Sequence, residues 1–89
     1  MPTQPLTLIA AMQGTYVVND TTAWTGKCDG VYTLEDTVFS VLNDSNSNDK
    51  ADYISTPATA VKAGCLIRPL NDEVFTAVTL TSGSVALIL

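Results

Sequence analysis

The 89-residue chain has no histidine, only four basic residues and two cysteines. Without histidine, the usual zinc ligand sets and the Ser-His and Cys-His nucleophile pairs are excluded. Nucleic-acid binding needs clustered Lys and Arg to neutralise phosphates, and a net charge of −5 argues against such a cluster. Anionic membrane surfaces are disfavoured for the same reason. We therefore expect no nucleic-acid partner and no membrane partner.

Long hydrophobic runs are also missing from the sequence. No segment reaches the length of a membrane span. The first residues lack the positive region of a secretory signal, and Thr7 interrupts their apolar stretch. We expect no export signal at this end.

Cys28 and Cys65 form no CxxC pair. Two cysteines are few beside the dense patterns of small secreted domains. We interpret both as small buried apolar side chains, with a disulfide between them as the alternative.

The hydrophobic content is high for so short a chain. Hydrophobic residues make up 46% of the sequence, and the mean hydropathy is +0.24. A small domain has a marginal core and much surface to cover with polar groups. Excess apolar content therefore predicts that a partner or a further copy buries part of the surface.

The sequence pattern is β throughout and predicts an all-β fold, a small antiparallel β-sandwich or barrel in a single domain. Thr and Val, which favour strands, are abundant, and no stretch holds a helical apolar period. Residues 1–5 carry two prolines and are expected to form an extended N-terminal arm. Residues 6–89 are expected to form the β domain, with about seven or eight short strands.

Turn signals divide the domain into expected strands and loops. Lys27 to Gly30 predicts a turn, and residues 43–52 predict a disordered polar loop. Ser82-Gly83 between two apolar runs predicts a β-hairpin, whose second strand is apolar without alternation and therefore covered on both faces. The expected strands are 6–13, 16–18, 31–34 and 38–42 (two strands, or one strand with an irregularity at 35–36), 53–54, 59–68 with a bend at Ala63-Gly64, 73–81 and 84–89.

Three groups of residues resemble sites of chemistry. Residues 44–49 resemble the opening of a calcium loop, but Asp49 and Ser55 replace the required Gly and Glu, so we expect a solvated loop and no metal. The acidic residues beside the expected strands of Phe39 and Phe75 are expected to be solvated. We therefore expect no catalytic residue, no cofactor and no enzyme activity. The aromatic residues favour the core or an interface over a stacking face for sugars or bases. The acidic group is Glu35, Asp36, Asp72 and Glu73, and the aromatic group is Tyr16, Trp24, Tyr32 and Tyr53.

Apolar character alone gives two lists of candidate residues. The expected core comprises Phe39, Val41, Leu66, Phe75, Val78, Leu80, Val85 and Leu87. The expected interface with a capsid or a second subunit comprises Leu6, Leu8, Trp24, Tyr53, Ile88 and Leu89.

The second half of the chain carries a resemblance to a known class of proteins. Gly64-Cys65-Leu66-Ile67-Arg68-Pro69, followed by the run from Phe75 through Ser82-Gly83 to Leu87, resembles the close of many small tailed-phage virion proteins. Their pattern is F-t-s-i-t-L-x-S-G-x-V-i-a-y, which ends in an aromatic residue. Here the end, 86–89, is more apolar and lacks the usual aromatic residue.

The resemblance implies a capsid decoration (cement) protein or a head-fibre base module. Such a protein is made in the host cytoplasm and then bound to the outer capsid surface of the virion. Its partners would be the major capsid protein and itself, as a homotrimer. The alternative is a tail-fibre or head-fibre module that binds a receptor or glycan through Trp24 and the tyrosines. A minor subunit of a toxin or enzyme complex is a third possibility, against which the missing histidine argues.

Overall fold

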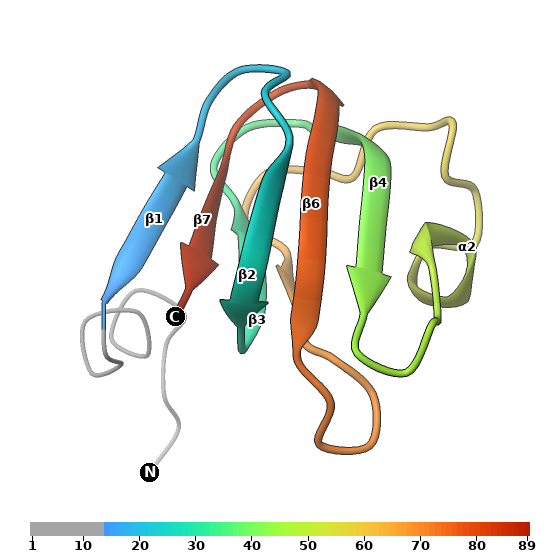
Figure 1. The fold of residues 1–89 in the computed structure, drawn as a ribbon. Helices are drawn as coiled ribbons and strands as arrows, with labels where there is room; N and C mark the ends of the chain where they lie inside the picture. Colours follow the sequence, from blue (N-terminus) through green and yellow to red (C-terminus); the bar gives the residue numbers. More distant parts are fainter. Residues whose placement is uncertain (1–13) are drawn as a thin grey trace, which may run out of the picture.

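The computed structural model describes residues 14–89, which form two antiparallel sheets packed face to face (Figure 1). One sheet has the strand order β1-β7-β3-β5 and the other the order β2-β6-β4. This arrangement confirms the all-β prediction and decides for a sandwich. The expected arm at 1–5 and strand at 6–13 lie outside the described residues. The strands are β1 (Thr15–Val18), β2 (Trp24–Cys28), β3 (Gly30–Thr33), β4 (Val38–Asp44), β5 (Leu66–Ile67), β6 (Phe75–Ser82) and β7 (Val85–Ile88).

The chain changes sheet at every connection between the described strands. Every pairing therefore joins strands that are not consecutive in the sequence. The prediction of a β-hairpin around Ser82-Gly83 is wrong, because β6 and β7 lie in different sheets. Each is flanked on both sides in its own sheet, β6 by β2 and β4, and β7 by β1 and β3. Because each of these strands already pairs on both sides within its own sheet, neither has a free edge with which to pair with the other.

The apolar strand β7 is covered on both faces, as expected from its lack of alternation. Val85 and Leu87 belong to the core cluster between the sheets. Ile88 is only 1% exposed, and it lies beside Gly30 and the side-chain stem of Arg68. The cover on both faces therefore comes from within one copy.

The link between β6 and β7 depends on a glycine. Gly83 has a φ of +92°, which L side chains rarely adopt. A Cβ atom there would lie 2.6 Å from the carbonyl oxygen of Asp36 and 2.7 Å from the Cα of Thr37. The hydroxyl of Thr37 also donates a hydrogen bond to the carbonyl of Ser84 at 3.3 Å. The corner is thus locked against the start of β4.

The buried core agrees with most of the predicted list. Six of the eight expected residues are at most 1% exposed, and the exceptions are Val41 and Leu66. Val41 lies opposite Thr79 and so points away from the core, while Leu66 is half-buried on the two-residue edge strand β5. The six confirmed core residues are Phe39, Phe75, Val78, Leu80, Val85 and Leu87.

The predicted polar loop at 43–52 contains a short helix, α2 (Lys50–Tyr53). Its N-cap is Asp49, whose carboxylate accepts from the Ala51 N–H at 3.0 Å, while Asp52 accepts from the Asp49 N–H at 2.9 Å. This reciprocal capping box satisfies amide groups that otherwise lack partners. The predicted strand at 53–54 is accordingly wrong.

Two further boundaries differ from the sequence prediction. The expected turn at 27–30 is shorter, because β2 continues to Cys28 and β3 begins at Gly30 in the other sheet. The expected strand at 59–68 is reduced to β5 and to an isolated bridge between Val61 and Thr37. The predicted bend at Gly64 is present, with a φ of +83°.

Candidate interaction surfaces

The expected interface residues do not form one surface. Leu6 and Leu8 lie outside the described residues. Ile88 is buried within the copy, so a partner cannot reach it directly, whereas Leu89 beside it is 38% exposed. Trp24 and Tyr53 are half-buried and pack against the core cluster. Of the described members of that list, only Leu89 presents a large apolar side chain to solvent.

Tyr53 belongs to a polar cluster around Asp44, a residue that is only 4% exposed. One carboxylate oxygen of Asp44 accepts from the backbone N–H groups of Asn46 and Asn48, each at 2.9 Å. The other oxygen accepts from the Asn48 side-chain amide at 3.0 Å and from the Tyr53 hydroxyl. The ring of Tyr53 packs edge-on against Phe75, with the ring centroids 5.0 Å apart. We call these four polar residues the Asp44 cluster.

The Asp44 cluster accounts for the segment that resembles a calcium loop. Removal from water raises the pKa of the Asp44 carboxyl, but the hydrogen bonds from Tyr53, Asn48 and Asn46 outweigh that effect and lower the pKa to about 2. Burial and the same contact with Asp44 raise the pKa of Tyr53. Both carboxylate oxygens are engaged by donors of the chain itself, so the cluster orders residues 45–53 against β4.

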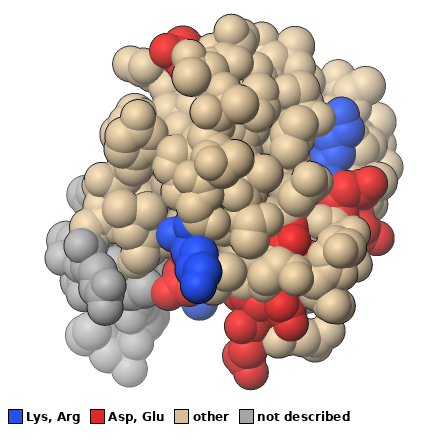
Figure 2. Space-filling model, viewed as in Figure 1, with Lys and Arg blue, Asp and Glu red and all other residues tan. Residues whose placement is uncertain are grey.

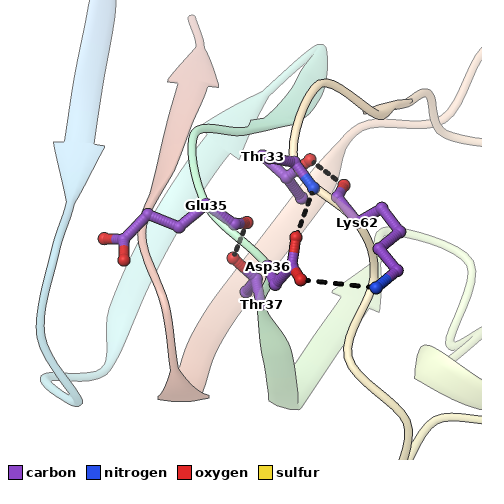
Figure 3. A network of polar contacts seen from close by, with 6 residues as sticks. Thr33, Glu35, Asp36, Thr37 and Lys62 are labelled. Atoms are coloured by element: carbon purple, nitrogen blue, oxygen red, sulfur yellow. Dashed lines mark hydrogen bonds and ion pairs between the residues drawn. The ribbon is translucent and has the colours of Figure 1, made fainter.

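A second polar cluster fastens the segment before β5 to the corner between β3 and β4 (Figure 3). Asp36 accepts from the Ala63 N–H at 3.0 Å and lies 3.5 Å from the ammonium group of Lys62. These two contacts, the hydrogen bond first, lower the pKa of Asp36. The hydroxyl of Thr33 donates to the Lys62 carbonyl at 2.7 Å, and its oxygen accepts from the Cys65 N–H at 2.8 Å. Every member is engaged within the fold, which indicates a structural role.

Neither cysteine is in a disulfide. Cys28 is buried, as expected, and burial raises the pKa of its thiol to about 11. Cys65 is only half-buried, so the interpretation of both as core residues holds for Cys28 alone.

Chemistry-bearing groups do not converge elsewhere in the described part. Residues 14–89 contain no group of three or more Cys, Asp or Glu side chains placed to hold a metal ion. A shallow hollow beside the end of β1 contains one carboxylate, Asp20, which already accepts from the Thr22 N–H at 3.0 Å. No helix within this range is long and apolar enough to span a membrane.

The side of the three-stranded sheet that faces away from the core is largely uncharged, and its one charged strand residue is Lys27 at the end of β2. Val78 and Leu80 of β6 are buried, so the residues that alternate with them point outward. Residues directly opposite each other on paired strands share a face. Figure 2 views this side: acidic side chains lie mainly along its right and lower parts, and one basic side chain lies in its lower centre. We call these outward residues the outer face: Thr25, Val41, Asn43, Ala77 and Thr79.

The edge strand β1 is the second exposed apolar feature. Tyr16 is 54% exposed and Val17 is 49% exposed, the two highest values among the large hydrophobic residues described. Leu89 lies at the adjoining end of β7, where its N–H donates to the Gly14 carbonyl at 3.0 Å. The sequence predicted a strand at 16–18 but gave no sign that it forms an edge, because its partner β7 comes from the far end of the chain.

The four aromatic residues considered for sugar stacking are dispersed. Trp24 lies opposite Val78 and therefore on the core side of its sheet. Tyr53 is engaged with Phe75 and Asp44, while Tyr16 and Tyr32 belong to the other sheet. They do not form one platform.

Comparison of the chain with protein-family models, with curated proteins and with solved structures found no match.

Proposed function

We propose that the chain is a non-enzymatic structural protein of a tailed-phage particle, a decoration protein that binds the outer capsid surface and stabilises the head. The observation that carries the proposal is the uncharged outer face. The sequence resemblance to small tailed-phage virion proteins supports the same proposal.

The outer face suits docking against a large, flat partner. Thr25 is exposed and Thr79 is half-buried, and Val41 and Ala77 are apolar and half-buried. Burying apolar area contributes about 25 cal/mol for each Å². Burying charge would cost desolvation, and the five outer-face residues carry none; Lys27, at the end of β2, lies beside them. Repeated attachment across a symmetric capsid adds avidity to a modest single contact.

The uneven distribution of charge supports the same orientation. The chain has nine acidic residues and four basic ones, so the copies repel one another at long range. Asp72 and Glu73 lie in the segment just before β6, beyond the end of the sheet, rather than on the outer face. In the proposed orientation the acidic end stays hydrated while the outer face meets the capsid.

The test uses heads of the phage that encodes the chain. The heads are prepared from a mutant phage in which the gene for this chain is deleted. The purified chain is added back, and binding is measured by co-sedimentation with the heads. We expect saturable binding and a higher temperature of head disruption. Failure to bind, or selective sugar binding on a glycan array instead, would contradict the proposal.

A pair of matched variants tests the outer face. Thr79→Lys places a charge at the centre of the face, on a side chain that points away from the core, so the fold is expected to persist. Thr59→Lys makes the same change at an exposed position between α2 and β5. We expect Thr79→Lys to lose binding to heads and Thr59→Lys to retain it. Equal binding by both variants would show that another surface meets the capsid.

A further inference from the structure

The exposed edges of the two sheets differ in how they are protected against pairing with another chain. Natural edge strands are blunted by shortness, charge, proline, bulges or a covering element. β5 has two residues and is followed by Arg68 and Pro69. β2 shifts register between Thr25 and Cys28 and carries Lys27. β4 shifts register at three places, α2 packs beside it, and the ammonium group of Lys50 caps the Ser40 carbonyl at 3.1 Å.

In the described part of the chain, β1 is protected by no charge, proline, bulge or covering element. Its four residues, Thr15 to Val18, include no charge and no proline, and they pair with β7 without a register shift. Among residues 14–89, no strand pairs with its other side. β1 is therefore the one described edge that is open to a further strand.

The direction of the free backbone groups follows from the pairing with β7. The Leu89 N–H donates to the Gly14 carbonyl, which makes these two a hydrogen-bonded pair. Such pairs alternate along an antiparallel ladder, so Tyr16 and Val18 also bond to β7. The N–H and C=O groups of Thr15 and Val17 point away from the sheet.

We propose that β1 pairs antiparallel with β1 of a second copy across a two-fold axis, with Tyr16 opposite its counterpart. In this register Thr15 of each copy faces Val17 of the other, and all the outward N–H and C=O groups of these residues are paired. The two four-stranded sheets become one continuous eight-stranded sheet (4 + 4). The exposed Tyr16 rings meet as a cross-strand aromatic pair.

Self-pairing is favoured because the strand is complementary to itself and uncharged. The nearest carboxylate along the chain after β1 is Asp20, four residues beyond Tyr16. Asp20 follows β1 after its end at Val18, and in this register the two Val18 residues already lie four positions apart along the ribbon, about 14 Å at 3.4 Å for each residue. That separation exceeds a Debye length of about 8 Å at physiological salt. Repulsion between the two Asp20 side chains is therefore screened.

The comparison of the four sheet edges favours a dimer over the homotrimer that the resemblance implies. A closed ring of three copies needs β1 to pair with a different edge of its neighbour. The other three edges are all blunted, and only the two-fold arrangement uses β1 twice. The inference stands independently of the proposed function, because its test involves no capsid.

The first test is sedimentation equilibrium of the purified full chain. We expect a reversible dimer. Val17→Pro removes an outward N–H that makes no bond to β7, and proline is tolerated on an edge when its missing N–H faces solvent. It deletes two of the four bonds between copies, which predicts a dissociation constant about 10- to 100-fold higher and a shift toward the monomer.

Val17→Lys provides a second block at the same edge, and Leu34→Lys is its control. Leu34 is 46% exposed, close to the 49% of Val17, and lies outside β1. We expect Val17→Lys to yield monomers and Leu34→Lys to remain dimeric. A wild-type chain that is monomeric at all concentrations, or a trimer insensitive to both changes at Val17, would overturn the proposal.

Cross-linking tests the register. Opposite residues in a non-hydrogen-bonded pair have Cα atoms about 4.5 Å apart, within disulfide range. In a Cys65→Ser background, Tyr16→Cys should form a disulfide-linked dimer under mild oxidation. Val17→Cys should form far less, because each Val17 faces Thr15. Equal cross-linking by both variants would overturn the proposed register.

Discussion

Replacing Gly83 by alanine tests the most specific packing contact of the fold. Gly83 lies where the chain passes from β6 in one sheet to β7 in the other. Its φ of +92° is unfavourable for alanine, and the new methyl group would lie 2.6 Å from the Asp36 carbonyl oxygen. That neighbour is backbone, as is the Thr37 Cα at 2.7 Å, so neither can move aside as a flexible side chain would. The whole corner must shift to accept Gly83→Ala.

Gly64 supplies the matched control for the backbone conformation. Its φ of +83° is close to that of Gly83, but the nearest atom to an added Cβ is the Tyr32 hydroxyl oxygen at 3.8 Å, an ordinary contact. Gly64→Ala therefore carries the left-handed penalty alone, about 1–2 kcal/mol. Gly83→Ala adds the cost of overpacking, typically about 1–3 kcal/mol. The predicted total is about 2–5 kcal/mol, a large share of the roughly 5–15 kcal/mol that stabilises a domain.

Urea unfolding followed by Trp24 fluorescence, together with thermal melting followed by circular dichroism, measures both variants. In a domain of this size, about 1 kcal/mol shifts the melting temperature by roughly 4–8 °C. We expect Gly83→Ala to melt at least about 5 °C below Gly64→Ala, or to be unfolded while Gly64→Ala folds. Equal losses in the two variants would refute the argument that β4 closes the space around Gly83.

Three further outcomes are expected. The low pKa of Asp44 in the fold, about 2 against an ordinary value of 3.8, stabilises the protein above about pH 4, and this stability is lost as the pH falls toward 2. Tyr53→Phe removes a donor to Asp44, so its acid unfolding, followed by fluorescence, should begin at higher pH than in the wild type; an unchanged profile would contradict the role of that hydrogen bond. A thiol reagent at pH 8 should label Cys65 well before Cys28, whose thiol is buried and has a pKa of about 11, and equal rates would contradict that burial. Phe75→Ala should destabilise the fold by about 3–5 kcal/mol in urea unfolding, because it empties a fully buried site; a loss below 1 kcal/mol would show that the site collapses freely.

The class of fold and much of the core follow from local features of the sequence. Branched residues and alternation predict strands, and both Phe39 and Phe75 were expected in the core. Both are buried, and they lie on the adjacent strands β4 and β6. Burial at these positions depends on neighbours within a strand or two, so the local pattern is sufficient to predict it.

The assignment of strands to sheets could not be predicted in this way. Ser82-Gly83 is a turn signal whether the next strand returns beside β6 or crosses to the other sheet. The choice depends on Thr37, which bonds to Ser84 and packs against Gly83 from far along the chain. The helix α2 was missed for a related reason, because a run of Asn, Asp and Ser looks solvated until Asp44 is known to be buried and to gather its donors.

The residues on which the resemblance to phage virion proteins rests lie more in the interior of this fold than on its surface. Phe75, Leu80 and Val85 are buried, and Gly83 is held at the corner between the sheets. Such residues specify how the sheets pack, so the resemblance bears on architecture, and binding must be tested on the outward residues. The outer face and the β1 edge belong to different sheets. Thr79→Lys and Val17→Lys therefore act on separate contacts: the first should abolish binding to heads and leave the dimer intact, while the second should yield monomers that still bind each head site, with reduced avidity.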